Sequence, residues 1–169
     1  MAVSQQHRQR IAELLGREPR GLEDVSVTSS TGQPMVIRVA SLVEDKPFPT
    51  LFWLVDAALC YRIDTVEAGG LIAQLQQRID ESADYQAQMA DDHRRHIVLR
   101  DSFIGVSERQ KIESLGFSGV FQQKGIGGIS DFTRIRCLHT WYAAHLVASN
   151  TVGDLLDEHW RQAGEQHCN

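Results

Sequence analysis

Seven basic side chains of this sequence form a set that we expect near one central helix, and their chemistry suits the binding of an anion. Arginine forks hold the oxygens of phosphates and carboxylates, and a histidine that titrates near pH ~6.5 suits general acid–base work. The net charge of the chain is −5, so such a set is unusual here. Its members are Arg38, His93, Arg100, Lys124, Arg134, Arg136 and His139. We expect a pocket for a phosphorylated or carboxylated small molecule. If the protein is an enzyme, His139 or His93 is the best candidate for the general acid or base.

Within this set, Arg136 and His139 are three residues apart and would share one side of a helix. We therefore expect both in one pocket that also contains Arg100 or His93. The alternative is internal pairing of the arginines, which would leave a non-catalytic interaction module. Acidic residues available for such pairing include Glu44, Asp56, Glu67 and Asp101.

The glycine-rich segment runs from Lys124 through Gly125, Gly127 and Gly128 into a predicted helix. Glycines let backbone N–H groups approach an anion, and a helix N-terminus adds partial positive charge. The spacing matches neither a Walker loop nor a dinucleotide-binding fingerprint, and Asp131 would repel an anion. Two interpretations therefore remain: an anion cradle, or a turn whose glycines adopt positive φ.

Cys137, His139 and His145 are residue types that bind zinc, but the predicted secondary structure argues against a shared ion. On one continuous helix, at about 100° per residue, Cys137 and His139 would point ~160° apart. His93 and His96 could share a helix face, although two ligands are too few for a zinc site. The sequence thus predicts no metal site. It also predicts that Cys137 is a small buried residue, since no base is placed beside it.

A helix expected over Thr133–Ser149 must position most of these residues. Its apolar residues recur at spacings of three and four and form two stripes, which predicts a helix buried on most sides. The first stripe is Phe132, Ile135, Leu138, Tyr142 and Leu146; the second is Cys137, Trp141, Ala144 and Ala148.

The elements expected around this helix indicate an α+β fold, with a small antiparallel sheet of about three strands and a mainly helical C-terminal half. Residues 1–56 read as an N-terminal helix, a hairpin and a third strand, without the βαβ alternation of a doubly wound sheet. Residues 64–160 read as helices, the first of them starting with Asp64 and Glu67 at capping-box spacing. We expect one domain over residues 1–169.

Composition limits the functional class and the compartment. A negative net charge and a pI near 5.8 argue against general nucleic-acid binding. No run approaches the ~18 apolar residues of a membrane span. The three cysteines are scattered without a close pair, which favours reduced thiols in cytoplasm. Cys168 lies in a polar tail, where we expect it to be exposed and reactive. The sequence indicates neither a cofactor nor an oligomeric state.

Several short motifs resemble the bacterial family catalogued as domain of unknown function 501. They are LGREPRG, PFPTLFWL, VEAGG, GIGG, RIRCLH, AAHL and NTVGD, and they cover about Leu15 to Asp157. Two family motifs are changed here: Thr-Cys-Pro reads Val55-Asp56-Ala57, and Asn-Pro-x-Gly begins Asn150-Thr151. No role of the family's cysteine therefore carries over. The resemblance implies a cytoplasmic bacterial protein and no particular reaction.

Overall fold

The computed structural model describes residues 2–164, so Cys168 lies outside the described residues. The chain order is α1 (Gln5–Leu15), β1 (Leu22–Thr28), β2 (Pro34–Val39), β3 (Leu42–Val43), β4 (Lys46–Pro47), β5 (Phe52–Leu54), α2 (Ala57–Ala68), α3 (Leu71–Asp80), α4 (Ala83–Phe103), α5 (Val106–Ser114), α6 (Ser118–Gln123), a 3₁₀ turn (Ile126–Gly128), α7 (Leu138–Val147) and α8 (Thr151–Gln162). Among the described residues, no helix is both long and apolar enough to cross a bilayer.

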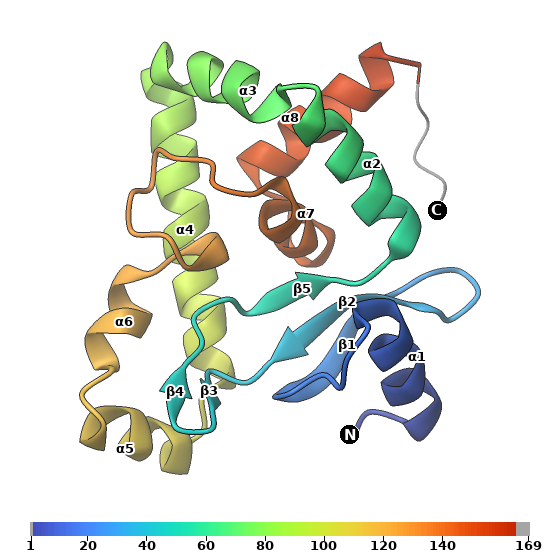
Figure 1. The fold of residues 1–169 in the computed structure, drawn as a ribbon. Helices are drawn as coiled ribbons and strands as arrows, with labels where there is room; N and C mark the ends of the chain where they lie inside the picture. Colours follow the sequence, from blue (N-terminus) through green and yellow to red (C-terminus); the bar gives the residue numbers. More distant parts are fainter. Residues whose placement is uncertain (1, 165–169) are drawn as a thin grey trace.

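The main sheet has the order β1-β2-β5, and both strand pairs are antiparallel. Successive residues of a strand point to opposite faces. In β2, accordingly, Ile37 packs with α1 through Ile11, whereas Val36 joins the larger cluster that contains α7. Helices α2 to α8 make up most of the chain after β5, and Figure 1 shows the main sheet below α2, α7 and α8, with α5 and α6 at the lower left. The α+β prediction is confirmed.

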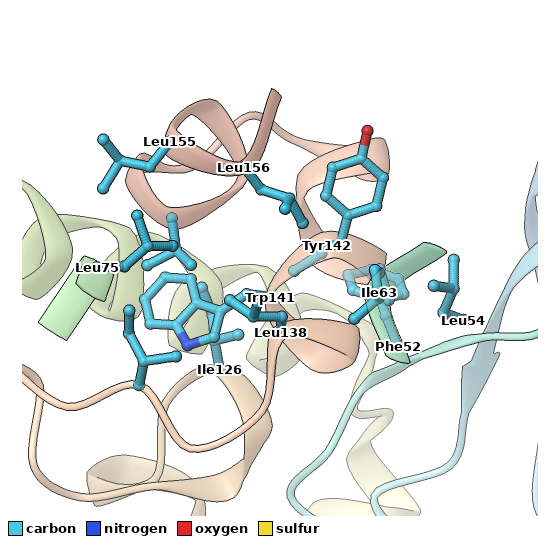
Figure 2. Packing of buried hydrophobic residues seen from close by; sticks show 14 of the residues in the cluster. Phe52, Leu54, Ile63, Leu75, Ile126, Leu138, Trp141, Tyr142, Leu155 and Leu156 are labelled. Atoms are coloured by element: carbon cyan, nitrogen blue, oxygen red, sulfur yellow. The ribbon is translucent and has the colours of Figure 1, made fainter. Parts of the chain in front are cut away.

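Helix α7 occupies the centre of the larger core, as predicted. Leu138, Trp141, Tyr142 and Ala143 are 0–1% exposed. Side chains from β5, α2 and α8 surround them, including Phe52, Ile63, Leu155 and Leu156, as Figure 2 shows. In Figure 1, α7 lies between β5 and α8. A helix buried on this many sides explains its two apolar stripes.

The predicted start of this helix is wrong by five residues: α7 begins at Leu138, not at Thr133. Two side chains hold the preceding segment in a non-helical form. Asp131 Oδ1 accepts hydrogen bonds from the amide and hydroxyl of Thr133. Gln76 of α3 donates to the Thr133 carbonyl and accepts from the amide of Ile135. Those backbone groups are therefore not available for a helical turn.

Helix α8 begins against α7 with no space for an extra methyl group at Gly153. The Asn150 side chain caps α8 by accepting from the Gly153 amide at 2.8 Å. A Cβ built on Gly153 would lie 2.1 Å from Cγ of His145. The His145 ring is itself held between Asp157 Oδ2, 2.9 Å away, and the amide of Asn150. The imidazole therefore has little freedom to move aside.

Gly153→Ala is expected to destabilise the protein by about 2 kcal/mol, because the added methyl group must displace the His145 ring. Alanine normally stabilises a helical position by ~1 kcal/mol relative to glycine. Gly119→Ala in α6 is the control, since a Cβ there meets only the end of the Gln123 side chain, at 3.9 Å. Urea unfolding of both variants measures the difference. Equal stability of the two would contradict the prediction.

Candidate metal centre

Three potential ligands meet at the N-terminus of α7. Because the helix begins at Leu138, Cys137 is extended (φ −154°, ψ 125°) and lies just outside it. Its Sγ is 3.5 Å from Nδ1 of His139, and Oε1 of Glu67 is also 3.5 Å from that nitrogen. The three donor atoms all lie within 4.8 Å of one another. The angular argument against a shared ion is thus wrong for Cys137 and His139, since it assumed one continuous helix.

Helix α2 supplies the acidic side of this group. Asp64 and Glu67 are three residues apart and therefore share one side of α2. Asp64 Oδ1 lies 2.9 Å from Nε2 of His139, the ring nitrogen that faces away from Cys137. Glu67 Oε1 also accepts a hydrogen bond from the amide of Leu138 at 2.7 Å. This bond fixes the Glu67 carboxylate at the partially positive end of α7.

These two carboxylates had suggested a helix start, which the structure corrects. Helix α2 begins at Ala57, and its cap is Asp56, whose side chain accepts from the amide of Leu59. Asp64 and Glu67 lie in the second half of that helix. Sequence reasoning missed both as site residues. Their spacing was the available signal, but it had been assigned to capping.

The charges around His139 favour a positively charged group at this position. The hydrogen bond to Cys137 raises the pKa of His139 to about 9, Glu67 and Asp64 add to this effect, and burial opposes it. Burial raises the pKa of Cys137, but the hydrogen bond to His139 and nearby backbone amides outweigh it and lower that pKa below the ordinary thiol value. Among residues 2–164, Asp64 and Glu67 pair with no lysine or arginine. Three acidic groups therefore surround a single imidazole.

A pocket of about 320 Å³ borders the same histidine. It lies beside β5, which is one of the two edge strands of the three-stranded sheet. Aromatic and aliphatic groups form most of its walls, and two threonines contribute hydroxyl groups. The lining residues are Phe48, Thr50, Phe52, Trp53, Leu54, His139 and Thr140. His139 thus belongs both to the group of potential metal ligands and to the pocket lining.

The basic residues singled out in the sequence are distributed over separate partners. Arg136 is exposed and forms no ion pair within the described part of the chain. Arg38 stacks on the Phe103 ring, with 4.1 Å between its guanidinium carbon and the ring centroid. The polar partners are Glu23 for Arg38, Asp80 and Asp131 for Arg134, and the Ser130 hydroxyl for Lys124. Of the predicted site residues, only His139 joins the group at α7.

Arg100 is buried with an exposure of 1%, and among residues 2–164 no carboxylate forms an ion pair with it. Its guanidinium donates to the carbonyl oxygens of Pro49, Phe121 and Lys124 at 2.8, 2.6 and 2.7 Å. Burial lowers the pKa of Arg100 to about 10, so it remains charged at neutral pH. The partners expected for Arg100 were an anionic ligand or an acidic side chain, and backbone carbonyls were overlooked as acceptors.

His93 forms a hydrogen bond with the glycine-rich segment. The His93 side chain is fully buried, and its Nδ1 accepts from the amide of Ile126 at 2.9 Å. Gly125 allows this approach, since a Cβ there would lie 2.1 Å from Nδ1. Gly127 and Gly128 have φ of 70° and 72°. The Gly125 and Gly128 amides donate within the loop. These contacts favour the turn interpretation over the anion cradle.

Two buried histidines are expected to make the protein unstable in acid. Burial lowers the pKa of His93 to about 4 and that of His96 to about 3, from an ordinary 6.5. The unfolded chain then binds these protons more readily than the folded chain. The stability that depends on these two neutral histidines is therefore fully present above pH ~6.5. It is lost as the pH drops towards 4, and the free energy of unfolding falls by on the order of 2 kcal/mol per histidine at pH 4.5.

Urea midpoints at pH 7.5 and 4.5, measured with a metal chelator present, test this expectation. His96→Phe keeps a ring beside Phe52 and removes one of the two protonation sites. This variant should lose less stability than the parent protein over the same pH interval. An equal loss would show that His96 does not contribute to the acid response.

The comparisons with known proteins identify a family. No curated protein and no solved structure matches the chain. The family model described as "Protein of unknown function (DUF501)" matches residues 25–158. This range includes Asp64, Glu67, Cys137 and His139, and it confirms the resemblance seen in the short motifs. The chain therefore belongs to the family of domain of unknown function 501.

Proposed function

We propose that this protein binds a divalent transition metal ion of the zinc class through Glu67, Cys137 and His139. The observation that carries the proposal is the spacing of the donors. Ligand bonds of ~2.0–2.3 Å in a tetrahedral zinc site place neighbouring donor atoms roughly 3.4–3.6 Å apart. Both Sγ of Cys137 and Oε1 of Glu67 are 3.5 Å from Nδ1 of His139. The distance between Oε1 of Glu67 and Nδ1 is longer than that of an ordinary N–H···O hydrogen bond.

Asp64 supports the proposal from outside the ligand group. A proton on Nε2 of His139 donates to Asp64, which leaves the Nδ1 lone pair free for an ion. Most histidines that bind metals have such a partner, which orients the ring and increases its basicity. Sulfur, nitrogen and oxygen together form a donor set that suits zinc. A divalent cation would also neutralise the excess negative charge.

An open coordination position gives the ion a function. Three protein ligands leave the fourth position of a tetrahedral zinc ion for water or substrate, as in catalytic zinc sites. There the ion can polarise an oxygen-bearing group or activate water. A phosphorylated or carboxylated small molecule fits this position through its oxyanion. His139 then serves as a ligand, and recognition of the anion depends on the metal more than on the arginines.

The bacterial, cytoplasmic setting implied by the family resemblance suits this chemistry. Cys60 and Cys137 are both free thiols. A reducing compartment keeps Cys137 available as a thiolate ligand.

Titration of chelator-treated protein with Zn²⁺ and Co²⁺ tests the proposal. We expect one ion per chain and, with Co²⁺, a thiolate charge-transfer band in the near ultraviolet. Cys137→Ser should remove that band and weaken binding by at least about 100-fold. Asp64→Asn should weaken binding roughly 10–100-fold and keep the band, since Asp64 acts through the His139 ring.

Cys60→Ser is the matched control, because the Cys60 thiol lies near Cys137 but donates to the Leu54 carbonyl. It should keep both the band and the affinity. Absence of saturable metal uptake would refute the proposal, as would loss of the band in Cys60→Ser alone.

The pairing of the arginines favours a second candidate, a non-catalytic interaction module. Arg38 and Arg134 bind carboxylates of the protein, and Arg100 binds its carbonyls. A protein of this kind should bind neither metal nor oxyanion, and its melting temperature should not respond to zinc, phosphate or pyrophosphate.

A further inference from the structure

We infer that the pocket beside β5 receives a ring-bearing apolar group of a ligand whose oxygen atoms coordinate the metal. The ligand class is therefore small aromatic molecules with an oxyanion or hydroxamate-like head. This inference rests on the proposed metal site and adds the part of the ligand that the metal does not bind.

The walls of the pocket determine this class. Phe48, Phe52 and Trp53 are aromatic, and Leu54 is aliphatic. The Phe48 and Trp53 rings contact each other with 5.5 Å between centroids and 47° between their planes. Aromatic pairs favour such tilted or edge-to-face arrangements, and a ligand ring would continue the set. A volume of about 320 Å³ lies near the lower end, roughly 300 Å³, of small-molecule sites.

Secondary structure fixes the pocket relative to the metal ligands. His139 and Thr140 are consecutive residues of α7, and both line the pocket. The Thr140 hydroxyl donates to the carbonyl of Cys137 at 3.1 Å, which ties the pocket wall to a second proposed ligand. A ligand with its head on the ion beside His139 would therefore place its body along β5.

The glycine-rich segment packs against residues that line this pocket. A Cβ on Gly127 would lie 2.7 Å from the Thr140 hydroxyl oxygen. A Cβ on Gly128 would lie 3.2 Å from Pro49 and 3.6 Å from the hydroxyl oxygen of Thr50. The two glycines therefore let the loop pack closely against Thr50 and Thr140, both of which line the pocket.

The test compares two hydroxamates on the zinc-loaded full-length chain by calorimetry. Benzohydroxamate and acetohydroxamate offer a metal the same head, and only the first carries a ring. We expect benzohydroxamate to bind at least about tenfold more tightly, because its ring is buried against the aromatic wall. Phe48→Ala should reduce this preference to less than about threefold, while the affinities for zinc and acetohydroxamate stay unchanged.

Phe103→Ala is the control, since Phe103 is an exposed aromatic residue that does not line the pocket. It should keep the full preference. If zinc binds but the parent protein shows no preference for the ring, the pocket inference fails and the metal site stands. The same holds if Phe48→Ala retains the preference. If zinc does not bind, both proposals fail.

Discussion

Arg100→Ala is expected to destabilise the protein by at least about 4 kcal/mol, the largest loss we expect from any single change. The substitution leaves three carbonyl oxygens without their donor, those of Pro49, Phe121 and Lys124. Each unsatisfied buried group costs about 1–3 kcal/mol, and the missing side chain also leaves a cavity.

Arg100→Lys separates charge from geometry. A lysine keeps the charge but lacks the planar fork that reaches three acceptors at once. Its stability should therefore lie between those of the parent protein and Arg100→Ala. The measurement is urea unfolding followed by circular dichroism. Similar stabilities of Arg100→Ala and the parent protein would refute the role of Arg100 in holding the loops.

Leu138→Ala is expected to cost ~2–5 kcal/mol, because Leu138 is fully buried in the larger core. The loss should appear in the presence of a chelator, since it comes from packing and not from the neighbouring metal ligands. Val98→Ala on α4 is the control. Val98 is 70% exposed, so its truncation should change stability by less than ~0.5 kcal/mol. An unchanged unfolding midpoint for Leu138→Ala would contradict the central position of α7.

The fold class and the central helix could be predicted because both depend on local patterns of apolar residues. The helix start could not. Phe132, Ile135 and Leu138 have the spacing of a helix face, but Gln76 binds the backbone around Ile135 from α3. That contact spans 59 positions in the sequence, and no local pattern records it. Such a long-range hydrogen bond overrides helical periodicity.

The error at the helix start also concealed the candidate site. Cys137 and His139 diverge on a helix but meet when Cys137 is extended. Glu67 lies 70 or more positions away from both residues, so its proximity depends on how α2 packs against α7. The charges of the basic residues were visible in the sequence. Their partners were not, because Arg100 binds carbonyl oxygens, which every residue carries.

The three carbonyl contacts of Arg100 also bear on the rate of unfolding. They join Arg100 to residues 51, 21 and 24 positions away, and so bring together the segment before β5, helix α6 and the glycine-rich segment. Contacts between distant segments require closure of long loops, whose entropic cost must be met before they form. We therefore expect Arg100 to bind its carbonyls after the folding transition state. Interactions of this kind slow unfolding and hardly change the folding rate. We therefore expect Arg100 to lower the unfolding rate through the loops that support the pocket.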